Sequence, residues 1–374
     1  MQSWDNNTGA FLALLRAGLW ETDVQLSAPG GIDFAEVYRI AREQAVVGVV
    51  AAALEHIKDI KAPQDDALLF IKNAIRTEQK NQSMNTFLAD IYGQMREEGI
   101  NSVLVKGQGI AQCYERPLWR APGDIDLMLN EADYEKSKAF VGAIGKVVED
   151  EHEYRKRIEY KVDKWLIELH GTMRGQLGRR IDRAIDQIQR EVCEGGRVRS
   201  WINAGTEVLL PAPDEDVILV FAHILQHFFR GGIGLRQVCD WCRLLWRYRS
   251  ELDLQLLESR IRAMGVMTEW QAFAALAVHE LGVPVDAMPF YSDAHRWKKK
   301  SLLILRYILA MGNFGFNRDL SYKKRYPFFK RMLISLKLRT ADFLTQFRVF
   351  PIDAARAYYH LWLNGLEEVL KKTV

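Results

Sequence analysis

The sequence predicts an α+β fold, in which a small mixed β-sheet core is flanked by N-terminal helices and a C-terminal helical bundle. Apolar residues recur at helical spacing through most of the first 99 residues and again beyond residue 211. Between these parts, short runs rich in β-branched residues and bounded by glycine are typical of strands. The changes of pattern divide the 374 residues into an N-terminal helical region (1–85), an α/β core (86–210) and a C-terminal helical domain (211–374).

The N-terminal region contains three stretches with helical spacing. The first is FLALLRAGLW, and the second is FAEVYRIAREQAVVGVVAAALEHI, a continuous helical pattern for which Asp33 is the expected N-cap. The third, ALLFIKNAIRTEQKNQSMNTFLADIYGQMREEG, is expected to end at Gly99, because glycine readily takes the left-handed conformation that closes a helix.

The core contains four predicted strands and a predicted helix. INSVLVKG and GDIDLMLN are each predicted as a short strand, with the helix-like IAQCYE between them. EADYEKSKAFVGAIG is predicted as a helix, and YRKRIEYKVDKWLIELHG as two strands that turn near residues 162–164. Beyond PAPDED, which begins a long helix, almost all of the chain is predicted as helix, with breaks at RGGIG, GVPVDAMPFYSD and FPIDA.

The composition is that of an ordinary globular protein. With 48% hydrophobic and 26% charged residues and a net charge of +3, the chain is neither disordered, collagen-like nor a coiled-coil rod. Four cysteines are too few for a disulfide scaffold, and Cys239 and Cys242, in CDWC, are predicted as structural thiols on an amphipathic helix. We expect a cytoplasmic protein without a membrane span, because the N-terminus lacks a signal-peptide pattern and Arg306 interrupts the longest apolar stretch.

Two aspartates interrupt the apolar run GDIDLML. Side chains alternate along a strand, so Asp124 and Asp126 are expected on one face and Ile125 and Leu127 on the other. A buried carboxylate without a partner costs several kcal/mol, and a bound divalent cation would remove that cost. Magnesium prefers such oxygen ligands, so the spacing predicts a metal site.

Basic residues and glycines precede the aspartates. Lys106, Gly107, Gln108 and Gly109 follow a predicted strand, where glycine lets backbone N–H groups approach an anion and lysine adds positive charge. Arg120 lies between the two strands, where a phosphate-binding site would use it as a planar clamp. The alternative is a tight strand–helix turn with a solvated lysine.

A third carboxylate lies in the strand WLIELHG. Glu168 stands between Ile167 and Leu169, so it faces away from them together with His170. On an adjacent strand, Glu168 would complete a two-metal site or deprotonate an attacking hydroxyl. The alternative is a solvent-facing glutamate on an edge strand.

These motifs together resemble the nucleotidyltransferases of the DNA polymerase β superfamily. The segment VLVKGQGIAQCYERPLWRAPGDIDLML is most similar to bacterial "nucleotidyltransferase family protein" sequences, which share KG, a tyrosine and an arginine, and then DIDLLV. IELHG and FAHILQHFFRGGIGLRQVCDWCRLLW resemble later segments of the same group, so the resemblance spans residues 103–246. No Walker-type GxxxxGK[ST] and no kinase signature is present.

The resemblance implies a metal-dependent transfer of a nucleoside monophosphate from an NTP, with release of pyrophosphate. It implies Asp124 and Asp126 as ligands of Mg²⁺ (two ions, with Mn²⁺ as an alternative), and Glu168 as the third acid. The expected nucleotide-binding residues are Lys106, Gly107, Gln108, Gly109, Arg120 and Arg236.

The resemblance does not identify the acceptor, and it has two departures. Gln108 stands where the superfamily usually has serine, and sixteen residues separate Gly107 from Asp124, a longer interval than the superfamily norm. Three functions therefore stay open: transfer to a small molecule, a catalytically decayed nucleotide-binding scaffold, and a toxin-like transferase that acts on RNA or protein. The basic segment YKKRYPFFKRMLISLKLR, which includes Lys323 and Lys324, is a solvated helix face or an RNA contact.

Two pairs at helical spacing have alternative interpretations. His223 and His227 lie at i, i+4, a geometry that can bind metal, but without the glutamate of a zinc protease motif packing or a supporting position around a site is the favoured role. Arg236 and Asp240 are also at i, i+4. Either they form an ion pair within the helix, or Arg236 faces the cleft near the nucleotide, as the resemblance implies.

Overall fold

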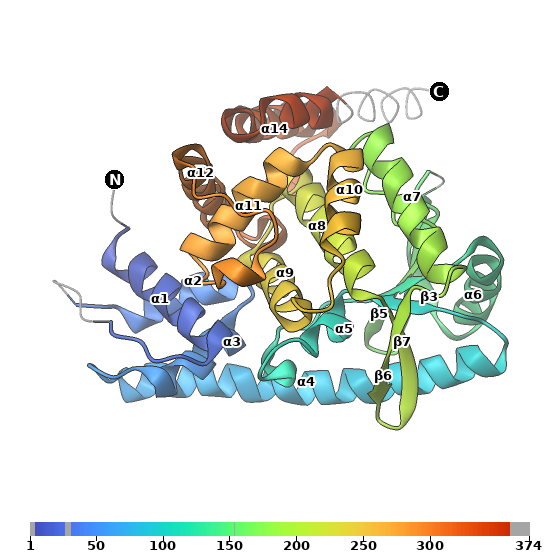
Figure 1. Cartoon of the computed structure of the whole chain (residues 1–374), viewed down its shortest axis with the longest axis horizontal. Helices are drawn as coiled ribbons and strands as arrows, with labels where there is room; N and C mark the ends of the chain where they lie inside the picture. The colour runs from blue at the N-terminus through green and yellow to red at the C-terminus, as the bar shows by residue number, and fades with distance from the viewer. Residues whose placement is uncertain (1–3, 27–30, 153, 360–374) are drawn as a thin grey trace.

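The computed structural model describes residues 4–26, 31–152 and 154–359 and shows the predicted α+β architecture (Figure 1). Helices α1–α3 lie at one end, a five-stranded sheet lies at the other, and a helical bundle lies above both (Figure 1). The N-terminal helices are α1 (Asn6–Trp20), α2 (Phe34–Glu43), α3 (Val47–Ala53), η1 (Leu54–His56) and α4 (Gln64–Glu97). The helices predicted beyond residue 359 lie outside the described residues.

Two N-terminal helix boundaries follow the sequence prediction and one does not. Asp33 caps α2 by accepting hydrogen bonds from the backbone N–H groups of Ala35 and Glu36. Gly99 has φ +64° just after α4, as a closing glycine should. The prediction of a continuous helix through FAEVYRIAREQAVVGVVAAALEHI is wrong, because Ala45, with φ +56°, separates α2 from α3.

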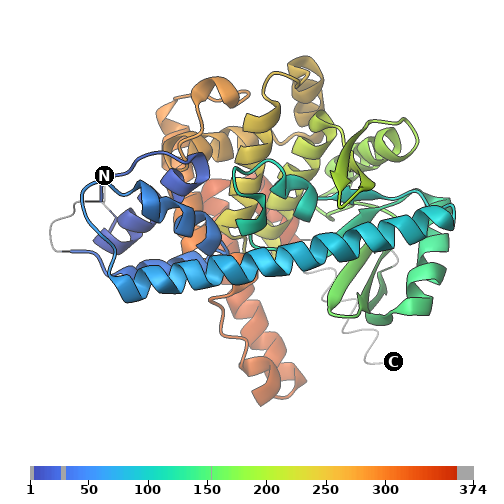
Figure 2. The same ribbon diagram turned by 90° about the horizontal axis from the view of Figure 1, so that it is seen from below.

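Helix α4 connects the two ends of the molecule. Its 34 residues correspond to a length of about 50 Å, and Figures 1 and 2 show it running along almost the whole molecule. Its first half contributes Phe70 and Ala74 to the core formed by the N-terminal helices and the C-terminal bundle. Its second half contributes Met84 and Leu88 to a separate core under the sheet. One helix thus fixes the position of the sheet relative to the bundle.

The sheet has the strand order β1-β2-β5-β4-β3. Strands β2 and β5 are parallel, and the other neighbouring pairs are antiparallel. The elements of this part are β1 (Val103–Val105), α5 (Gly107–Ala111), η2 (Pro117–Trp119), β2 (Ile125–Met128), α6 (Glu131–Ile144), β3 (Lys146–His152), β4 (Arg157–Val162), β5 (Trp165–His170), α7 (Arg179–Cys193), β6 (Val198–Asn203) and β7 (Thr206–Pro211).

Alternation along the central strands separates two environments. Ile125, Leu127 and Leu169 belong to the core shared with α4 and α6. Met128, one residue from Leu127, belongs instead to the core on the opposite face, where α8 lies. Polar side chains with the same parity as Met128 therefore face α8, and these include Asp126.

Three elements in this part were not predicted, and one begins earlier than predicted. The sequence indicated neither β3, nor α7, nor the separate β6–β7 hairpin. The helix predicted at IAQCYE begins at Gly107 and ends at Ala111, so the glycines belong to the first turn of α5 and form no separate loop before it.

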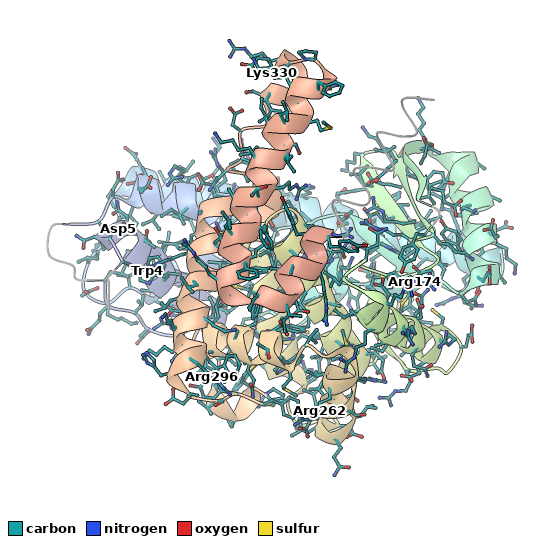
Figure 3. The ribbon with its side chains drawn as sticks, turned by 90° about the horizontal axis from the view of Figure 1, so that it is seen from above. Trp4, Asp5, Arg174, Arg262, Arg296 and Lys330 are labelled. Atoms are coloured by element: carbon teal, nitrogen blue, oxygen red, sulfur yellow. The ribbon has the colours of Figure 1, made fainter. Side chains whose placement is uncertain are left out.

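The C-terminal part is helical, as predicted. Helix α8 begins with Pro213 at its first turn and is buried along nearly its whole length, with Phe221 and Phe228 packed against the aromatic rings of neighbouring helices. The N-terminal end of α14 extends away from this bundle, and Figure 3 shows Lys330 near its far tip, whereas Val349 and Phe350 at the other end are buried in the core. The elements are α8 (Pro213–Arg230), α9 (Leu235–Tyr248), α10 (Leu254–Met264), α11 (Met267–His279), η3 (Val285–Ala287), α12 (His295–Met311), η4 (Asn313–Gly315), α13 (Tyr322–Arg325) and α14 (Phe328–Val349).

Candidate functional site

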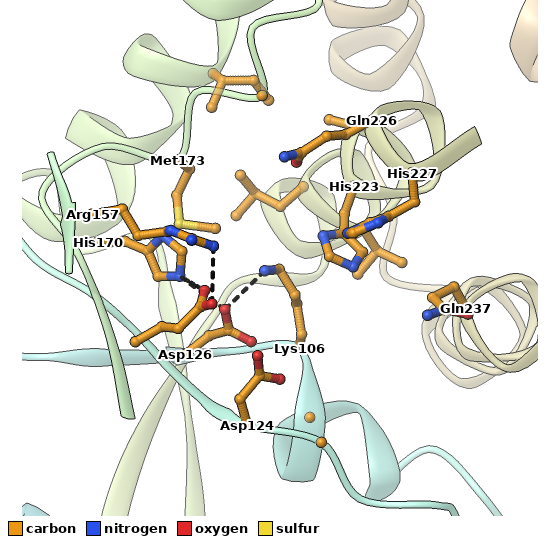
Figure 4. Close-up of a pocket in the computed structure, with 18 of the residues that line it drawn as sticks. Lys106, Asp124, Asp126, Arg157, His170, Met173, His223, Gln226, His227 and Gln237 are labelled. Carbon is orange, nitrogen blue, oxygen red and sulfur yellow. Dashed lines mark hydrogen bonds and ion pairs between the residues drawn. The ribbon is translucent and has the colours of Figure 1, made fainter. Parts of the chain in front are cut away.

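A cavity of about 430 Å³ lies between the polar face of the sheet and helices α8 and α9. Asp124, Asp126 and Lys106 line it on the sheet side, and His223 and His227 line it on the helix side (Figure 4). Most of the charged residues predicted to be functional therefore line this one cavity, although they come from segments about 100 residues apart.

Asp126, Glu168 and His170 form a buried cluster in this cavity. Asp126 on β2 is directly opposite Glu168 on the parallel strand β5, and His170 is two residues further along the same face. His170 Nε2 lies 2.8 Å from Asp126 Oδ1 and 3.2 Å from Glu168 Oε2. One ligand atom from each residue lies within 4.8 Å of the other two, a spacing that can hold a metal ion.

Asp124 faces the same cavity but lies outside this cluster of three. It precedes β2 by one residue, and its carboxylate points into the cavity beside Asp126 (Figure 4). The negative charge of Asp126, burial and the charge of Glu168 together raise the pKa of Asp124 above its ordinary value. The side chain of Asp124 is exposed to the open cavity, so the shift in its pKa is due chiefly to the neighbouring carboxylate of Asp126.

Lys106 is the cation nearest to Asp126. Its Nζ donates to Asp126 Oδ1 at 3.0 Å, and burial disfavours the ammonium while Asp126, Glu168 and Asp124 raise the pKa of Lys106 overall. Its backbone has φ +60°, a conformation that costs a non-glycine residue about 1–3 kcal/mol. This strained turn between β1 and α5 directs the ammonium into the acidic cluster.

The donor set fits a hard divalent cation. Three carboxylates and one imidazole converge on one side of the cavity, and carboxylate oxygens are the ligands that Mg²⁺ and Mn²⁺ prefer. Hydrogen bonds from Lys106 and His170 hold the pKa of Asp126 below its usual range despite its burial, so this carboxylate is ionised and available as a ligand.

The two histidines of α8 form the opposite wall. The rings of His223 and His227 lie 4.3 Å apart between centroids, and His227 also contacts the ring of Phe314. Burial, and then the charge of Lys106, lowers the pKa of both rings, to about 4 for His227, so both are neutral near pH 7. The structure thus places these histidines beside the cavity, whereas the sequence favoured packing or a supporting position around a site over metal binding.

Arg120 lines the cavity, but its guanidinium is committed to an ion pair. Its Nε and Nη2 atoms donate to the two carboxylate oxygens of Asp240, each at 2.7 Å. Tyr114 adds a third hydrogen bond to Asp240 at 2.7 Å. The partner of Asp240 is therefore Arg120, 120 residues away, and not Arg236 one helical turn away.

Arg236 is left facing the cavity, which is the second of its two sequence interpretations. Its Nη1 donates to the backbone carbonyls of Ala121 and Pro122, the residues just before Gly123 and Asp124. Its buried Nε has no hydrogen-bond partner among the described residues. Arg236 therefore positions the segment that carries Asp124 and keeps donors beside the cavity.

Two of the predicted nucleotide-binding residues do not line the cavity. The side-chain amide of Gln108 donates to Asn81 and Asn85 on α4, so it points away from the carboxylates. Gly109 packs against Leu210, where an added Cβ would lie 2.6 Å from a methyl group. Gly107 lines the cavity with φ +42°. The role of these three residues in nucleotide binding stays a prediction.

Several residues that line the cavity were not predicted from the sequence. Arg157 donates to Glu168 Oε1 at 3.0 Å and also pairs with Glu149. The run YRKR before β4 was a possible signal, since it places three cations beside a strand of the core. The other arginines that reach the cavity unpredicted are Arg155, Arg174 and Arg230.

Other predicted features have plain structural outcomes. Cys239 and Cys242 are buried free thiols whose pKa values burial raises, as expected of structural cysteines. Across the described ranges, no helix is long and apolar enough to cross a bilayer. The side chains of Lys323 and Lys324 lie outside the described residues, so RNA binding by this segment stays a prediction.

Comparison with protein families gives a match over much of the chain. A family model described as "uncharacterised nucleotidyltransferase" matches residues 30–282, which is more than half of the 374 residues. The matched range includes the five-stranded sheet, α8, α9 and the acidic cluster. No curated protein and no solved structure gave a significant match.

Proposed function

The chain belongs to this family of uncharacterised nucleotidyltransferases, and from that premise we propose that it is a magnesium-dependent enzyme that moves a nucleoside monophosphate from an NTP to an acceptor. Pyrophosphate leaves in this reaction. The proposal assigns the acidic cluster to metal binding and the basic residues beside it to the triphosphate.

One observation carries the proposal: Asp126 and Glu168 stand in register on two parallel strands, with Asp124 beside them, in a cavity. The pairing of Asp126 with Glu168 puts both carboxylates on the cavity face of the sheet. The charge of Asp126 raises the pKa of Asp124, as expected where two carboxylates share one site. A solvent-facing glutamate on an edge strand, the alternative for Glu168, does not agree with a buried residue on a central strand.

Asp124, Asp126 and Glu168 would hold the metal, with His170 as a neighbouring donor. When bound, Mg²⁺ would neutralise charge on the phosphates and orient the attacking and leaving oxygens. Manganese would fit the same carboxylates.

The remaining residues orient the ligands and bind phosphate. Arg157 donates to Glu168 Oε1 at 3.0 Å, and His170 Nε2 lies 3.2 Å from Glu168 Oε2, so these two side chains orient the Glu168 carboxylate as a ligand. Lys106 and Arg236 supply positive charge on the β1 side of the carboxylates, where we place the triphosphate. Gly107 offers a backbone N–H at the same turn.

Arg120 is assigned a structural role in this proposal, since its Nε and Nη2 atoms bind Asp240 and its Nη1 donates to the backbone carbonyl of Ala121. Binding of nucleotide without turnover is a second candidate function. It is favoured by Gln108, whose amide is occupied on α4 and does not replace the serine hydroxyl usual in the superfamily.

Transfer of label distinguishes these functions. The enzyme would be incubated with Mg²⁺, a total small-molecule extract and each NTP labelled at either the α- or the γ-phosphate. We expect label from the α-phosphate in a new acceptor product and label from the γ-phosphate only in the released pyrophosphate, and we expect both products to be lost in Asp126→Asn. Asp90→Asn, an exposed change on α4, is the matched control. Bound NTP that is recovered unchanged with every extract would instead support the second function.

A further inference from the structure

Among the residues that the structure describes, a pair of arginines at the β4 side of the cavity has no acidic partner. Arg155 lies in the loop before β4, and Arg230 is the last residue of α8; both line the cavity. Their guanidinium groups converge on Gln176, whose side-chain oxygen accepts from Arg155 at 3.1 Å and from Arg230 at 2.7 Å. The backbone carbonyl of Gln176 accepts a further bond from Arg230.

This pair differs from three of the other four arginines that line the cavity. The fourth, Arg236, also lacks a carboxylate partner in the described part of the chain and donates to the backbone carbonyls of Ala121 and Pro122. Arg120, Arg157 and Arg174 each form an ion pair with a carboxylate. Within the described ranges, neither Arg155 nor Arg230 forms one, and Nε of Arg155 is buried without a hydrogen-bond partner. Two partly buried cations with unused donors therefore remain in one part of the cavity.

The surroundings confirm that the positive charge is not balanced locally. Burial and the neighbouring charge of Arg155 lower the pKa of Arg230 to about 10, so it still carries its charge at pH 7. Asp182 is the carboxylate that acts on both arginines, but it accepts hydrogen bonds from Tyr154 and from the backbone of Gln176 instead. Arg339 on α14 adds further positive charge toward Arg230.

The geometry is that of a built site. Gln176, with φ +54°, holds a strained backbone conformation, and its one side-chain oxygen keeps two guanidinium groups together against their repulsion. Two guanidinium groups with spare N–H donors match a phosphate monoester, which carries a charge between about −1.5 and −2 near pH 7 and three acceptor oxygens. A carboxylate would neutralise only one of the two cations.

The order of the strands separates this pair from the triphosphate side. Lys106 follows β1, the carboxylates lie on β2 and β5, and Arg155 precedes β4, so the acidic cluster lies between the two cationic sides. Glu168 is among the charges that act on Arg155, which places the pair within electrostatic reach of the cluster. In-line transfer needs donor and acceptor on opposite sides of the reacting phosphorus.

We propose that Arg155 and Arg230 bind the phosphate group of the acceptor, and that the acceptor is a low-molecular-weight phosphate monoester. This inference rests on the proposed nucleotidyl transfer for the identity of the reaction, but the phosphate site itself stands on the two arginines. The two arginines would contact only the phosphate group, so this group alone defines the proposed class of acceptor.

Two titrations of the full chain test the proposal separately from the proposed function. Inorganic phosphate and each Mg·NTP would be titrated calorimetrically into wild type, Arg155→Gln/Arg230→Gln, Arg155→Lys/Arg230→Lys and Arg236→Gln. Arg183→Gln, an exposed arginine on α7, is the matched control. Circular dichroism would confirm that each variant is folded.

The expected result is a rise of at least tenfold in the Kd for phosphate in the double Gln variant, a smaller rise in the double Lys variant, and no change in Arg183→Gln. The Kd for Mg·NTP should stay within twofold in both double variants. Absence of phosphate binding in wild type, or its loss only in Arg236→Gln, would overturn the inference while leaving nucleotide binding to be judged by itself. Loss of Mg·NTP binding in the folded double variant would also overturn it, because the pair would then belong to the donor site. Failure of every Mg·NTP to bind wild type would count against the proposed function alone.

Discussion

The pair formed by Arg120 and Asp240 provides a quantitative prediction, because the sequence assigned Arg120 to phosphate binding and the structure assigns it to stability. We consider the replacement Arg120→Leu. Both side chains of the pair are almost fully buried, with exposed fractions of 4% and 5%, and two hydrogen bonds of 2.7 Å join them. After the replacement, Asp240 keeps only the hydroxyl of Tyr114.

The expected loss follows from this geometry. Removing one partner of a buried ion pair leaves an uncompensated charge and typically costs about 3–5 kcal/mol of the free energy of unfolding. Replacing both partners by apolar residues removes the charge that must be buried, so the loss should be much smaller. We therefore expect Arg120→Leu to lower the free energy of unfolding by about 3–5 kcal/mol, and Arg120→Leu/Asp240→Leu to recover at least half of that loss.

Urea denaturation followed by circular dichroism measures these differences. Asp240→Leu completes the double-mutant cycle, and its cost should resemble that of Arg120→Leu. Unchanged stability in Arg120→Leu, together with weakened Mg·NTP binding, would refute the reasoning, because the guanidinium would then serve the nucleotide and not Asp240.

Three further predictions concern packing, hydrogen bonding and pH. Gly48→Ala should lower the free energy of unfolding by about 1–3 kcal/mol, since its Cβ would lie 2.0 Å from a backbone oxygen of η2. Gly93→Ala, with open space around the added Cβ, should be neutral or stabilising. Equal effects of the two replacements in urea denaturation would contradict this prediction. Asn81→Ala should lower the free energy of unfolding by about 2–4 kcal/mol, because the Asn81 amide donates to the backbone carbonyls of Leu118 and Arg120 at 2.7 and 2.8 Å. A loss below about 1 kcal/mol would show that these carbonyls find other partners. Burial, and then a hydrogen bond with Asp353, raises the pKa of Glu269 from 4.5 to about 8. Between these two pH values the folded state keeps a proton that the unfolded state releases. The free energy of unfolding therefore falls as the pH rises from 4.5 to about 8. Glu269→Gln should remove about 4 kcal/mol of that fall between pH 5 and 9, at about 1.4 kcal/mol per pKa unit, and melting curves from pH 5 to 9 that are parallel for both proteins would exclude it.

Local patterns predicted the strands that carry the site. Alternation in GDIDLML placed Asp126 opposite in direction to Ile125 and Leu127, and the structure confirms that these two apolar residues lie in the core under the sheet. The expectation that Glu168 lies on an adjacent strand is confirmed by the parallel pairing of β2 with β5. These features depend only on the period of a strand, which a sequence displays directly.

Long-range partners could not be predicted in this way. Arg120 and Asp240 are 120 residues apart, and no local sequence pattern indicates that they pair. Arg236, in contrast, is four residues before Asp240 in the same helix, which is the usual spacing of an intrahelical ion pair. Burial decided between them, because the bidentate pair satisfies both oxygens of Asp240 at once. The same limitation applies to Arg155 and Arg230, which converge only through Gln176.

The edge strand β3 and the helix break at Ala45 were not predicted for a different reason. Strand β3, with the sequence KVVEDEH, carries mostly charged residues and lies at the edge of the sheet. Its Val147 and Val148 are half exposed. The strand therefore lacks the buried apolar face by which a central strand is predicted from sequence. The break at Ala45 is equally hidden, because apolar spacing continues through it while the backbone turns to a positive φ.

Metal-dependent nucleotide binding at the acidic cluster is the central claim, and calorimetric titration of the four NTPs with and without Mg²⁺ tests it most directly. Wild type, Asp126→Asn and the control Asp90→Asn would be compared. We predict that at least one NTP binds wild type and the control only with Mg²⁺, and that Asp126→Asn weakens this binding by at least tenfold. Unchanged binding in folded Asp126→Asn, or binding to wild type that is independent of Mg²⁺, would contradict the account.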